Sequence, residues 1–381
     1  MLQNVRFINY RGLKDTTLPL APVTLLTGTN AIGKTSILEG LYFLLSQVPD
    51  AVVFPRYQMS IGYQTNVNTP NGLPFYTPFI SKGYDYASFW KECPTSGTSG
   101  CQVEADLGDC KLTWKMKISD FALIPDELKT AFVAYYGHNT GITTQYALWE
   151  WNCTGTRKDN DSQEMVDVNH GAKAMQQLSM ERCISPITGN LTNTVCRYVD
   201  MSSTKYIPGQ LPYLTEKWLA PVLKMINSDV TGVRLDAGVQ PPRLRVIINE
   251  IEFSLGTLGV GAEAWASMLL LLAELLGTST GQASVMFLVD EIGAGIHYSK
   301  LGEMWDFLLM FVQTYPQIQM VLTTHSHDCI NAFCKTFQNA TPGMAHIVRL
   351  FKLGPESDVL TTVYQQDVFD SILSGEWEVR G

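Results

Sequence analysis

The residues Gly28–Ser36, GTNAIGKTS, have the types and spacing needed to bind a polyphosphate. Glycines at both ends of a turn let several backbone N–H groups point inward at an anion. At this spacing Lys34 can reach the β and γ phosphates of a nucleotide, and the Thr35 hydroxyl can bind Mg²⁺. The predicted nucleotide-binding residues of this loop are Gly28, Thr29, Asn30, Ala31, Ile32, Gly33, Lys34, Thr35 and Ser36.

The segments on either side of this loop favour the same interpretation over a chance glycine turn. The apolar run Val23–Thr27 predicts a buried strand, and Ile37–Leu45 has apolar residues at helical spacing. A strand, a glycine loop and a helix follow one another in the order that a phosphate-binding loop requires. The N-terminus of that helix adds a partial positive charge beneath the phosphates.

Two carboxylates, Asp290 and Glu291, follow the apolar run that begins at Ser284. The run predicts a buried strand, so both acids should lie at its carboxyl end. Asp290 is predicted to help hold Mg²⁺, and Glu291 to orient and deprotonate the attacking water. The alternative is a pair of acids that cap a helix.

His325 follows another predicted strand, Gln319–Thr324, and could donate a hydrogen bond to a γ-phosphate oxygen. Taken alone, a core or rim histidine is the commoner case. The order of the motifs favours a catalytic role for Glu291, His325 and Lys34. The glycine-rich turn Ser254–Trp265, which precedes an apolar helix through Leu276, is a second candidate anion site or simply a tight helix entry.

The remaining chain is predicted to contain further strands and helices. Asn4–Tyr10 alternates as a strand, and Arg11 in the turn after it is placed either near the nucleotide or in solvent. Residues 48–160 are predicted to form antiparallel strands joined by loops. The aromatic residues of this region are predicted to pack on strand faces, and a base-stacking platform is the less common alternative; they are Tyr84, Tyr86, Trp90, Trp149 and Trp151. The remaining predicted elements are strands at Gln102–Leu107, Leu112–Ile118, Tyr146–Asn152, Leu244–Glu252, His346–Lys352 and Val359–Tyr364, a polar loop at Thr154–Glu164, and helices at Pro212–Asn227 and Lys300–Gln313.

Composition narrows the class of protein. A net charge of -9 and a pI near 5.2 give no support to a nucleic-acid-binding surface. Eight cysteines without metal-ligand spacing favour free thiols in a reducing cytosol, with a Cys101–Cys110 disulfide as the lesser alternative. No signal peptide and no membrane-spanning run are found, so we expect a soluble cytoplasmic protein.

The motifs GTNAIGKTS, LGVGAEAW, VMFLVDEIGAGIHYS and VLTTHS, in this order, resemble the ATP-binding cassette (ABC) heads of the SMC and RecF kind. The chain is more similar to OLD (overcoming-lysogenization-defect) ATPases and to the stand-alone ATPases of phage-defence systems of the OLD-like or PARIS-like type. The resemblance implies that His325 is a switch histidine, and that Thr257, Gly259 and Gly261 contact the γ-phosphate bound to an opposing subunit. Two motifs depart from the usual pattern, Leu258–Gly261 and Ile292–Gly295. The Q-loop glutamine has no assigned position, and Gln58, Gln64 and Gln102 are all possible.

The resulting fold prediction is an α/β P-loop NTPase of the ABC head type. It has a mixed central sheet flanked by helices, an antiparallel β subdomain and no long coiled coil. Residues 1–47 and 212–381 are predicted to form the head, and 48–211 an inserted β-rich and helical subdomain. Only about fifty residues follow His325 in this sequence, so we expect the chain to carry no nuclease domain of its own.

The predicted function is that of an ATP- and Mg²⁺-dependent ATPase that forms homodimers or larger homo-oligomers through ATP-sandwiched heads, without a membrane partner. In phage defence it would control a separate nuclease-type effector and respond to a nucleic acid or a phage protein. Two alternatives stay open: a RecF-like or SMC-like DNA repair ATPase, and an ATP-binding regulatory scaffold with little turnover.

Overall fold

A computed structural model gives the fold of the chain. It describes residues 1–46, 100–107, 110–120, 126, 129–130, 145–158, 165–177, 183–184, 194–202, 215–236, 243–278, 284–354, 357–375 and 379. Tyr84, Tyr86 and Trp90, three of the aromatic residues interpreted above, lie outside the described residues, as do two of the possible Q-loop glutamines, Gln58 and Gln64.

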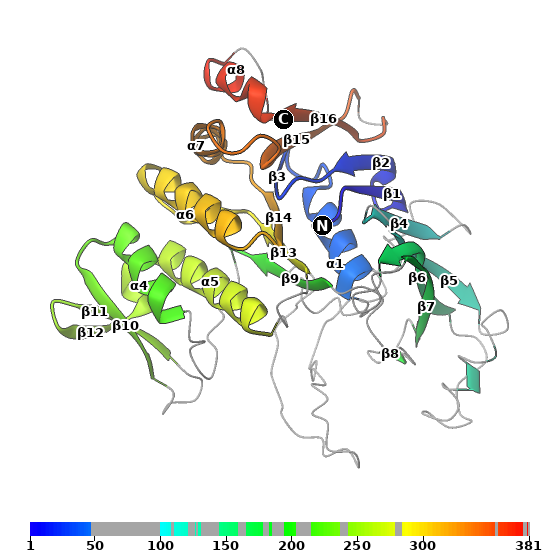
Figure 1. The fold of residues 1–381 in the computed structure, drawn as a ribbon, viewed down its shortest axis with the longest axis horizontal. Helices are drawn as coiled ribbons and strands as arrows, with labels where there is room; N and C mark the ends of the chain where they lie inside the picture. Colours follow the sequence, from blue (N-terminus) through cyan, green and yellow to red (C-terminus); the bar gives the residue numbers. More distant parts are fainter. Residues whose placement is uncertain are drawn as a thin grey trace.

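A six-stranded central sheet carries the predicted phosphate loop, with the strand order β16-β15-β3-β14-β13-β9 (Figure 1). Neighbouring strands from β15 to β9 are parallel, and β16 is antiparallel to β15. Their carboxyl ends therefore share one edge of the sheet, which is where ligands bind in parallel sheets. The strands are β3 (Val23–Thr27), β9 (Thr194–Asp200), β13 (Ser284–Asp290), β14 (Ile318–Thr323), β15 (Ala345–Phe351) and β16 (Leu360–Gln365).

Helices cover both faces of this sheet and form two hydrophobic cores. One core packs α5, α6 and α7 against the sheet, and the other packs α1 between this sheet and a second, antiparallel sheet (Figure 1). Gly40 of α1 allows this close approach, because a Cβ there would lie 2.5 Å from the Phe7 ring. The helices are α1 (Lys34–Ser46), α4 (Thr215–Ile226), α5 (Val260–Thr278), α6 (Leu301–Thr314), α7 (His327–Phe337) and α8 (Phe369–Leu373).

The antiparallel sheet has the order β2-β1-β4-β5-β6-β7-β8. Trp114 and Trp151 are both fully buried in the core around α1, and the Trp151 indole donates to the Phe43 carbonyl at 2.9 Å. The strand-face interpretation is therefore confirmed for Trp151. The strands are β1 (Asn4–Tyr10), β2 (Leu13–Pro19), β4 (Cys101–Asp106), β5 (Cys110–Asp120), β6 (Gln145–Lys158), β7 (Met165–Gln177) and β8 (Cys183–Ile184).

Two sequence predictions in this sheet need correction. Residues 154–158, predicted as the start of a polar loop, continue strand β6, because they pair in register with β7 through Lys158 and Met165. Cys101 and Cys110 are both free, so they form no disulfide with one another. They lie at opposite ends of the β4–β5 hairpin, where Cys101 is opposite Met116.

A third, smaller sheet has the order β10-β11-β12, with β10 at Val230–Asp236, β11 at Arg243–Ile248 and β12 at Ile251–Ser254. The prediction of one strand over Leu244–Glu252 is wrong. Asn249 and Glu250 have φ values of 48° and 67°, so the chain reverses there in a two-residue hairpin turn.

The predicted fold class, a mixed central sheet with flanking helices and an antiparallel sheet, is confirmed. The longest described helix is α5, with 19 residues, and the described part of the chain contains no long coiled coil. Strand β9 lies within the range 48–211 that was predicted as an insertion, yet it pairs with β13 in the central sheet. The division into head and insertion remains a prediction.

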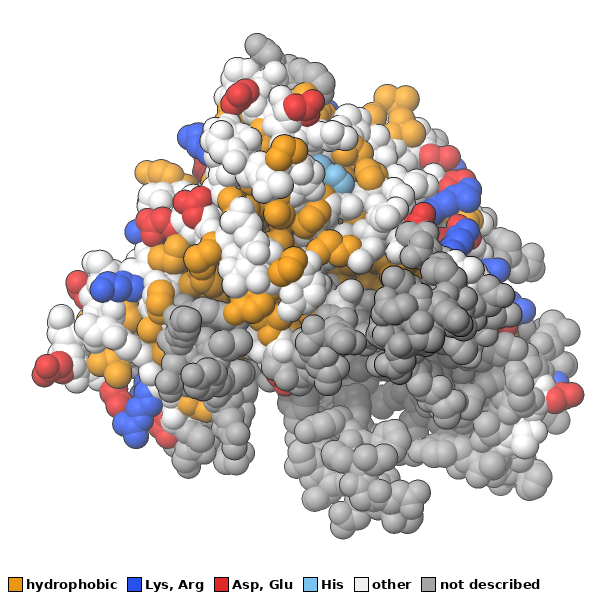
Figure 2. Space-filling model, viewed as in Figure 1, with side chains coloured by type: hydrophobic (Ala, Val, Ile, Leu, Met, Phe, Trp, Pro, Cys, Tyr) orange, Lys and Arg blue, Asp and Glu red, His pale blue; other side chains and the backbone are white. Residues whose placement is uncertain are grey.

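The surface of the described residues carries both signs of charge. On the face shown in Figure 2, Lys and Arg side chains are interspersed with Asp and Glu, and hydrophobic side chains gather over the middle of the view. None of the described helices combines the length and the apolar character that a bilayer span requires.

Candidate functional site

The loop between β3 and α1 is held in shape by its lysine and its glycines. The Lys34 ammonium is almost buried and donates to the carbonyls of Gly28 at 2.8 Å and Thr29 at 3.0 Å. Gly28 has φ 134°, and a Cβ there would lie 2.4 Å from the Leu350 carbonyl oxygen. Gly33 has φ 114°, so both glycines occupy backbone conformations that other residues rarely adopt.

Burial lowers the pKa of Lys34, and the nearby Glu291 and Asp290 carboxylates oppose this shift by favouring the charged form. The negative charges of both acids of the β13 motif therefore act on the lysine, although it comes from a segment more than two hundred residues earlier.

The Asp290 carboxylate lies at the end of β13 and accepts hydrogen bonds from three hydroxyls. Thr35 donates to Oδ2 at 2.8 Å, Tyr198 of β9 donates to the same oxygen at 3.1 Å, and Thr323 of β14 donates to Oδ1. Burial, followed by the negative charge of Asp290, raises the pKa of Tyr198, so its phenol stays protonated and remains a donor.

Glu291 lies next to Asp290 in a left-handed backbone conformation, with φ 56°. Its backbone N–H donates to the Thr323 hydroxyl at 2.9 Å, and its carboxylate is 2.6 Å from Nδ1 of His325. The Glu291 side chain is 30% exposed and that of His325 is 62% exposed, so both groups can reach a ligand from solvent. Unusual backbone conformations of this kind cluster at functional sites.

The residues at this edge fit a hydrated Mg²⁺ ion. Magnesium retains several waters and takes one or two protein oxygens in addition to phosphate oxygens. The Thr35 hydroxyl and Asp290 carboxylate supply two such oxygens, 2.8 Å apart. The described residues contain no group of three or more His, Cys, Asp or Glu side chains arranged for a metal.

Arg11, predicted either near the nucleotide or exposed in a turn, is not exposed. Its side chain is 9% accessible and forms an ion pair at 3.3 Å with Glu39 of α1, which is fully buried. The neighbouring turn reaches the phosphate loop, because a Cβ on Gly33 would touch Leu13 at 3.2 Å. Arg11 therefore fixes the β1–β2 turn against α1, the helix that begins at Lys34.

The glycine-rich turn leads into α5, which packs against the segment that follows the β13 motif. Thr257 and Gly259 are exposed, and the Thr257 hydroxyl donates to the Ser254 carbonyl at 2.7 Å. Gly261 begins the buried part of α5, and a Cβ there would lie 2.1 Å from the Gly295 carbonyl oxygen. This contact explains the glycine at 261 by packing within the chain. A role of Thr257, Gly259 and Gly261 toward an opposing subunit remains a prediction.

Two residues of the site had no predicted role, Tyr198 and Thr323. Tyr198 comes from β9, a strand that lies in the predicted insertion, and only its parallel pairing with β13 brings it to Asp290. Thr323 precedes the predicted Thr324–His325 motif by one residue, and strand alternation could have placed it beside Asp290. Of the other predicted residues of the loop, Asn30, Ala31 and Ile32 lie on the turn between β3 and α1, beside β15, and Ser36 lies in the first turn of α1.

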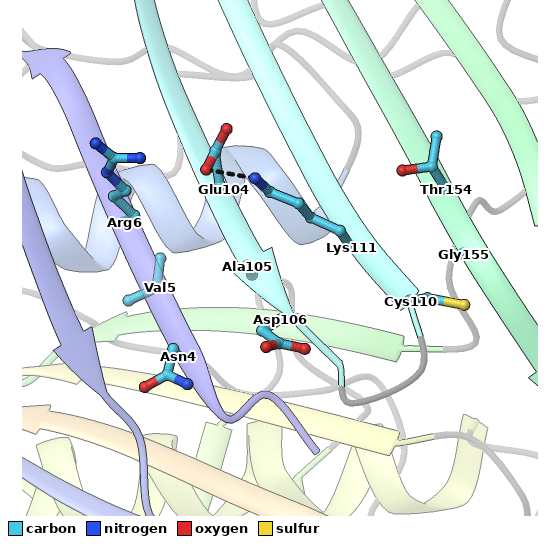
Figure 3. Close-up of a pocket in the computed structure, with 10 residues that line it drawn as sticks. All are labelled: Asn4, Val5, Arg6, Glu104, Ala105, Asp106, Cys110, Lys111, Thr154 and Gly155. Carbon is cyan, nitrogen blue, oxygen red and sulfur yellow. Dashed lines mark ion pairs between the residues drawn. The ribbon is translucent and has the colours of Figure 1, made fainter.

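Several hollows lie outside this hydroxyl-and-carboxylate cluster, among them the following two. The first, the β15 hollow, has a volume of about 410 Å³ between residues 29–32 and residues 349–352 and 354. The second, the sheet-face hollow, has about 390 Å³ over β1, β4, β5 and β6. Figure 3 shows the second, where the Glu104 carboxylate and the Lys111 ammonium form an ion pair of 2.7 Å across neighbouring strands.

Comparisons with known proteins agree with the motifs. A family model described as an AAA ATPase domain matches residues 1–82. An OLD nuclease of Thermus scotoductus is 31% identical over 94 residues, which are 24% of this chain and 18% of that protein. The aligned part thus spans less than a fifth of the relative.

Two solved structures align with most of this chain at low sequence identity. The Smc head domain of Pyrococcus furiosus, with an extended coiled coil and bound to the C-terminal domain of ScpA, is 8% identical with a TM-score of 0.44, over 99% of both chains. The recombination mediator protein RecF is 12% identical with a TM-score of 0.40, over 95% of this chain and 98% of that one. The resemblance to OLD-like ATPases, predicted from the motifs, is supported by the match to an AAA ATPase domain and by the similarity to an OLD nuclease.

Proposed function

We propose that this chain binds ATP together with Mg²⁺ and hydrolyses the γ-phosphate at the carboxyl edge of the central sheet. One observation carries the proposal: the Thr35 hydroxyl of the phosphate loop hydrogen-bonds Asp290, and the adjacent Glu291 contacts His325. A phosphate-binding group, a metal-binding carboxylate and a general base therefore meet in one place, as phosphoryl transfer to water requires.

Each side chain has a separate task in this reaction. Lys34, which now donates to two loop carbonyls, would turn its donors to the β and γ phosphate oxygens. Thr35 and Asp290 would hold the metal ion, which when bound neutralises charge on those oxygens. Glu291 would accept the proton of the attacking water, and His325 would hold the Glu291 carboxylate in position and contact the γ-phosphate.

The finer predictions about partners belong to this proposal. Two copies would place the exposed turn around Thr257 and Gly259 of one against the nucleotide of the other, in homodimers or larger oligomers. The similarity to an OLD nuclease supports a role in phage defence, as an ATP-dependent sensor that controls a separate nuclease-type effector. The trigger would be a nucleic acid or a phage protein.

The test is ATP binding and hydrolysis by the purified full chain. Lys34→Ala should abolish measurable ATP binding, since it removes the buried cation of the loop, and Glu291→Gln should bind ATP normally but lose turnover. Lys335→Ala, in α7 and exposed, is the matched control and should behave as the wild type. Hydrolysis that survives Lys34→Ala would contradict the proposal, and ATP binding by the wild type without turnover would favour a regulatory scaffold.

A further inference from the structure

The β15 hollow adjoins the phosphate loop on the side away from the catalytic acids. One wall consists of loop residues Thr29–Ile32, of which Thr29, Asn30 and Ala31 are exposed, and the other consists of Arg349–Lys352 and Gly354. Its volume of about 410 Å³ lies in the range of small-molecule sites. The second wall, which we call the β15 wall, shares no residue with the hydroxyl-and-carboxylate cluster described above.

The strand order sets the direction of a nucleotide bound to the loop. Asp290 ends β13, Thr323 ends β14, Thr27 ends β3, and Arg349 is opposite Thr27 in β15. These four strands are neighbours, so the ends of β13 and β15 are three strand spacings apart, or about 14 Å. In the proposed reaction the γ-phosphate lies at the β13 end, where Thr35 and Asp290 would hold the metal ion and Glu291 the attacking water. The rest of an extended nucleotide must then pass over β3 toward β15.

The chemistry of the β15 wall suits the nucleoside end. The Arg349 guanidinium lies 5.7 Å from the centre of the Phe351 ring, so a planar cation and an aromatic ring adjoin one another. Both side chains are half-buried and Lys352 is exposed. None of the residues lining this hollow is a carboxylate, so it does not repel a nucleotide.

The β15 hollow is also fixed in position relative to the phosphate loop. The Leu350 carbonyl oxygen occupies the space that any side chain at Gly28 would fill, at 2.4 Å from a Cβ built there. The first residue of the phosphate loop and the β15 wall are thus in direct backbone contact. A ligand that occupies both the phosphate loop and the β15 hollow therefore needs no rearrangement of the strands.

We propose that the β15 hollow binds the purine nucleoside of the substrate, with the base stacked on the Arg349–Phe351 pair. This inference rests on the proposed function, since it places the other end of the same nucleotide. Stacking and cationic contacts read the flat face of a base and not its edge, because every base has a π-face. The site therefore accepts adenine and guanine nucleotides with affinities that differ by less than about 10-fold.

The test compares two probes, Mg·ATP and Mg·tripolyphosphate, because the second lacks a nucleoside. Loss of stacking through Arg349→Ala should weaken ATP binding by about 10-fold and change tripolyphosphate binding by less than about 2-fold. Arg245→Ala, in β11 and paired with Asp236 at 3.8 Å, is the matched control and should leave both affinities unchanged. Lys34→Ala should weaken both probes.

Each outcome separates this inference from the proposed function. A wild-type chain that binds neither probe refutes the proposed function. A chain that binds both, with Arg349→Ala weakening both equally or neither, overturns the nucleoside placement alone. Discrimination between ATP and GTP above about 100-fold would also overturn it, since stacking cannot supply it. If thermal melts show that Arg349→Ala does not fold, Phe351→Leu, with the same expected selectivity for ATP over tripolyphosphate, decides.

Discussion

Two regions of the molecule, the sheet-face hollow and the edge of the central sheet, differ in how their charged groups are satisfied. On the sheet-face hollow, Lys111 pairs with Glu104 at 2.7 Å (Figure 3). Arg6, which also lines this hollow, pairs with Asp15 at 2.7 Å. At the edge of the central sheet, Lys34 instead donates to two backbone carbonyls, and Asp290 accepts from three hydroxyls. Ion pairs neutralise one another, whereas charges held by neutral groups remain available to a ligand.

Among substitutions in these two regions, Gly28→Ala should have the largest effect on ATP binding after Lys34→Ala. We expect ATP affinity to fall by about 100-fold, since backbone strain of roughly 1–3 kcal/mol adds to the collision with Leu350. Gly302→Ala is the matched control, because nothing lies within 4 Å of a Cβ at that helical position. Equilibrium binding of ATP and a thermal melt of each variant measure the two effects. Equal affinities in the two variants would show that the loop geometry is not needed.

Thr323→Val should lower turnover while the variant still binds ATP. The hydroxyl donates to Asp290 and accepts from the Glu291 backbone, so its loss frees both acids of the motif. We expect kcat to fall by about 100-fold, from two hydrogen bonds of which one is to a charged group, and KM to change by less than about 3-fold. Thr323→Ser should restore most of the rate, and Thr314→Val, on the surface of α6, should have none of these effects. A change confined to KM would assign Thr323 to substrate binding instead.

Tyr198→Phe removes one of the three donors to Asp290 and should have a smaller effect. Half-maximal activity should require about 10-fold more Mg²⁺, since a hydrogen bond to a charged group is worth roughly 1.5–3 kcal/mol. The raised pKa of Tyr198 keeps the phenol protonated, so the difference between variant and wild type should be constant from pH 7 to about 10. A magnesium titration of ATPase activity at several pH values checks both points, and a difference that disappears at alkaline pH would contradict the donor role.

The smallest effect should come from Lys111→Ala in the sheet-face hollow. The Lys111 side chain is 55% exposed, and exposed ion pairs of this kind contribute about 0–1 kcal/mol. ATPase rate and ATP affinity should stay within about 2-fold of the wild type, because no phosphate-binding group lies there. A larger loss of activity would mean that this face takes part in the reaction, and the contrast between the two regions would fail.

Sequence reasoning succeeded where one local segment contains the whole signal. The loop Gly28–Ser36 and the pair Asp290–Glu291 each adjoin an apolar strand, and the strands form as predicted. Tyr198 had no such signal, because its place beside Asp290 depends on pairing between strands ninety residues apart. The turn at Asn249–Glu250 was missed inside an apolar run, although asparagine is among the residues that tolerate positive φ.

The contact between Gly261 and Gly295 has a mechanical consequence. Two backbones touch there without a side chain between them, so neither segment can move closer to the other. Gly261 follows the exposed turn at Thr257, and Gly295 lies four residues after Glu291. A displacement of the outer turn toward Gly295 would therefore press on the segment that follows Glu291, the proposed base.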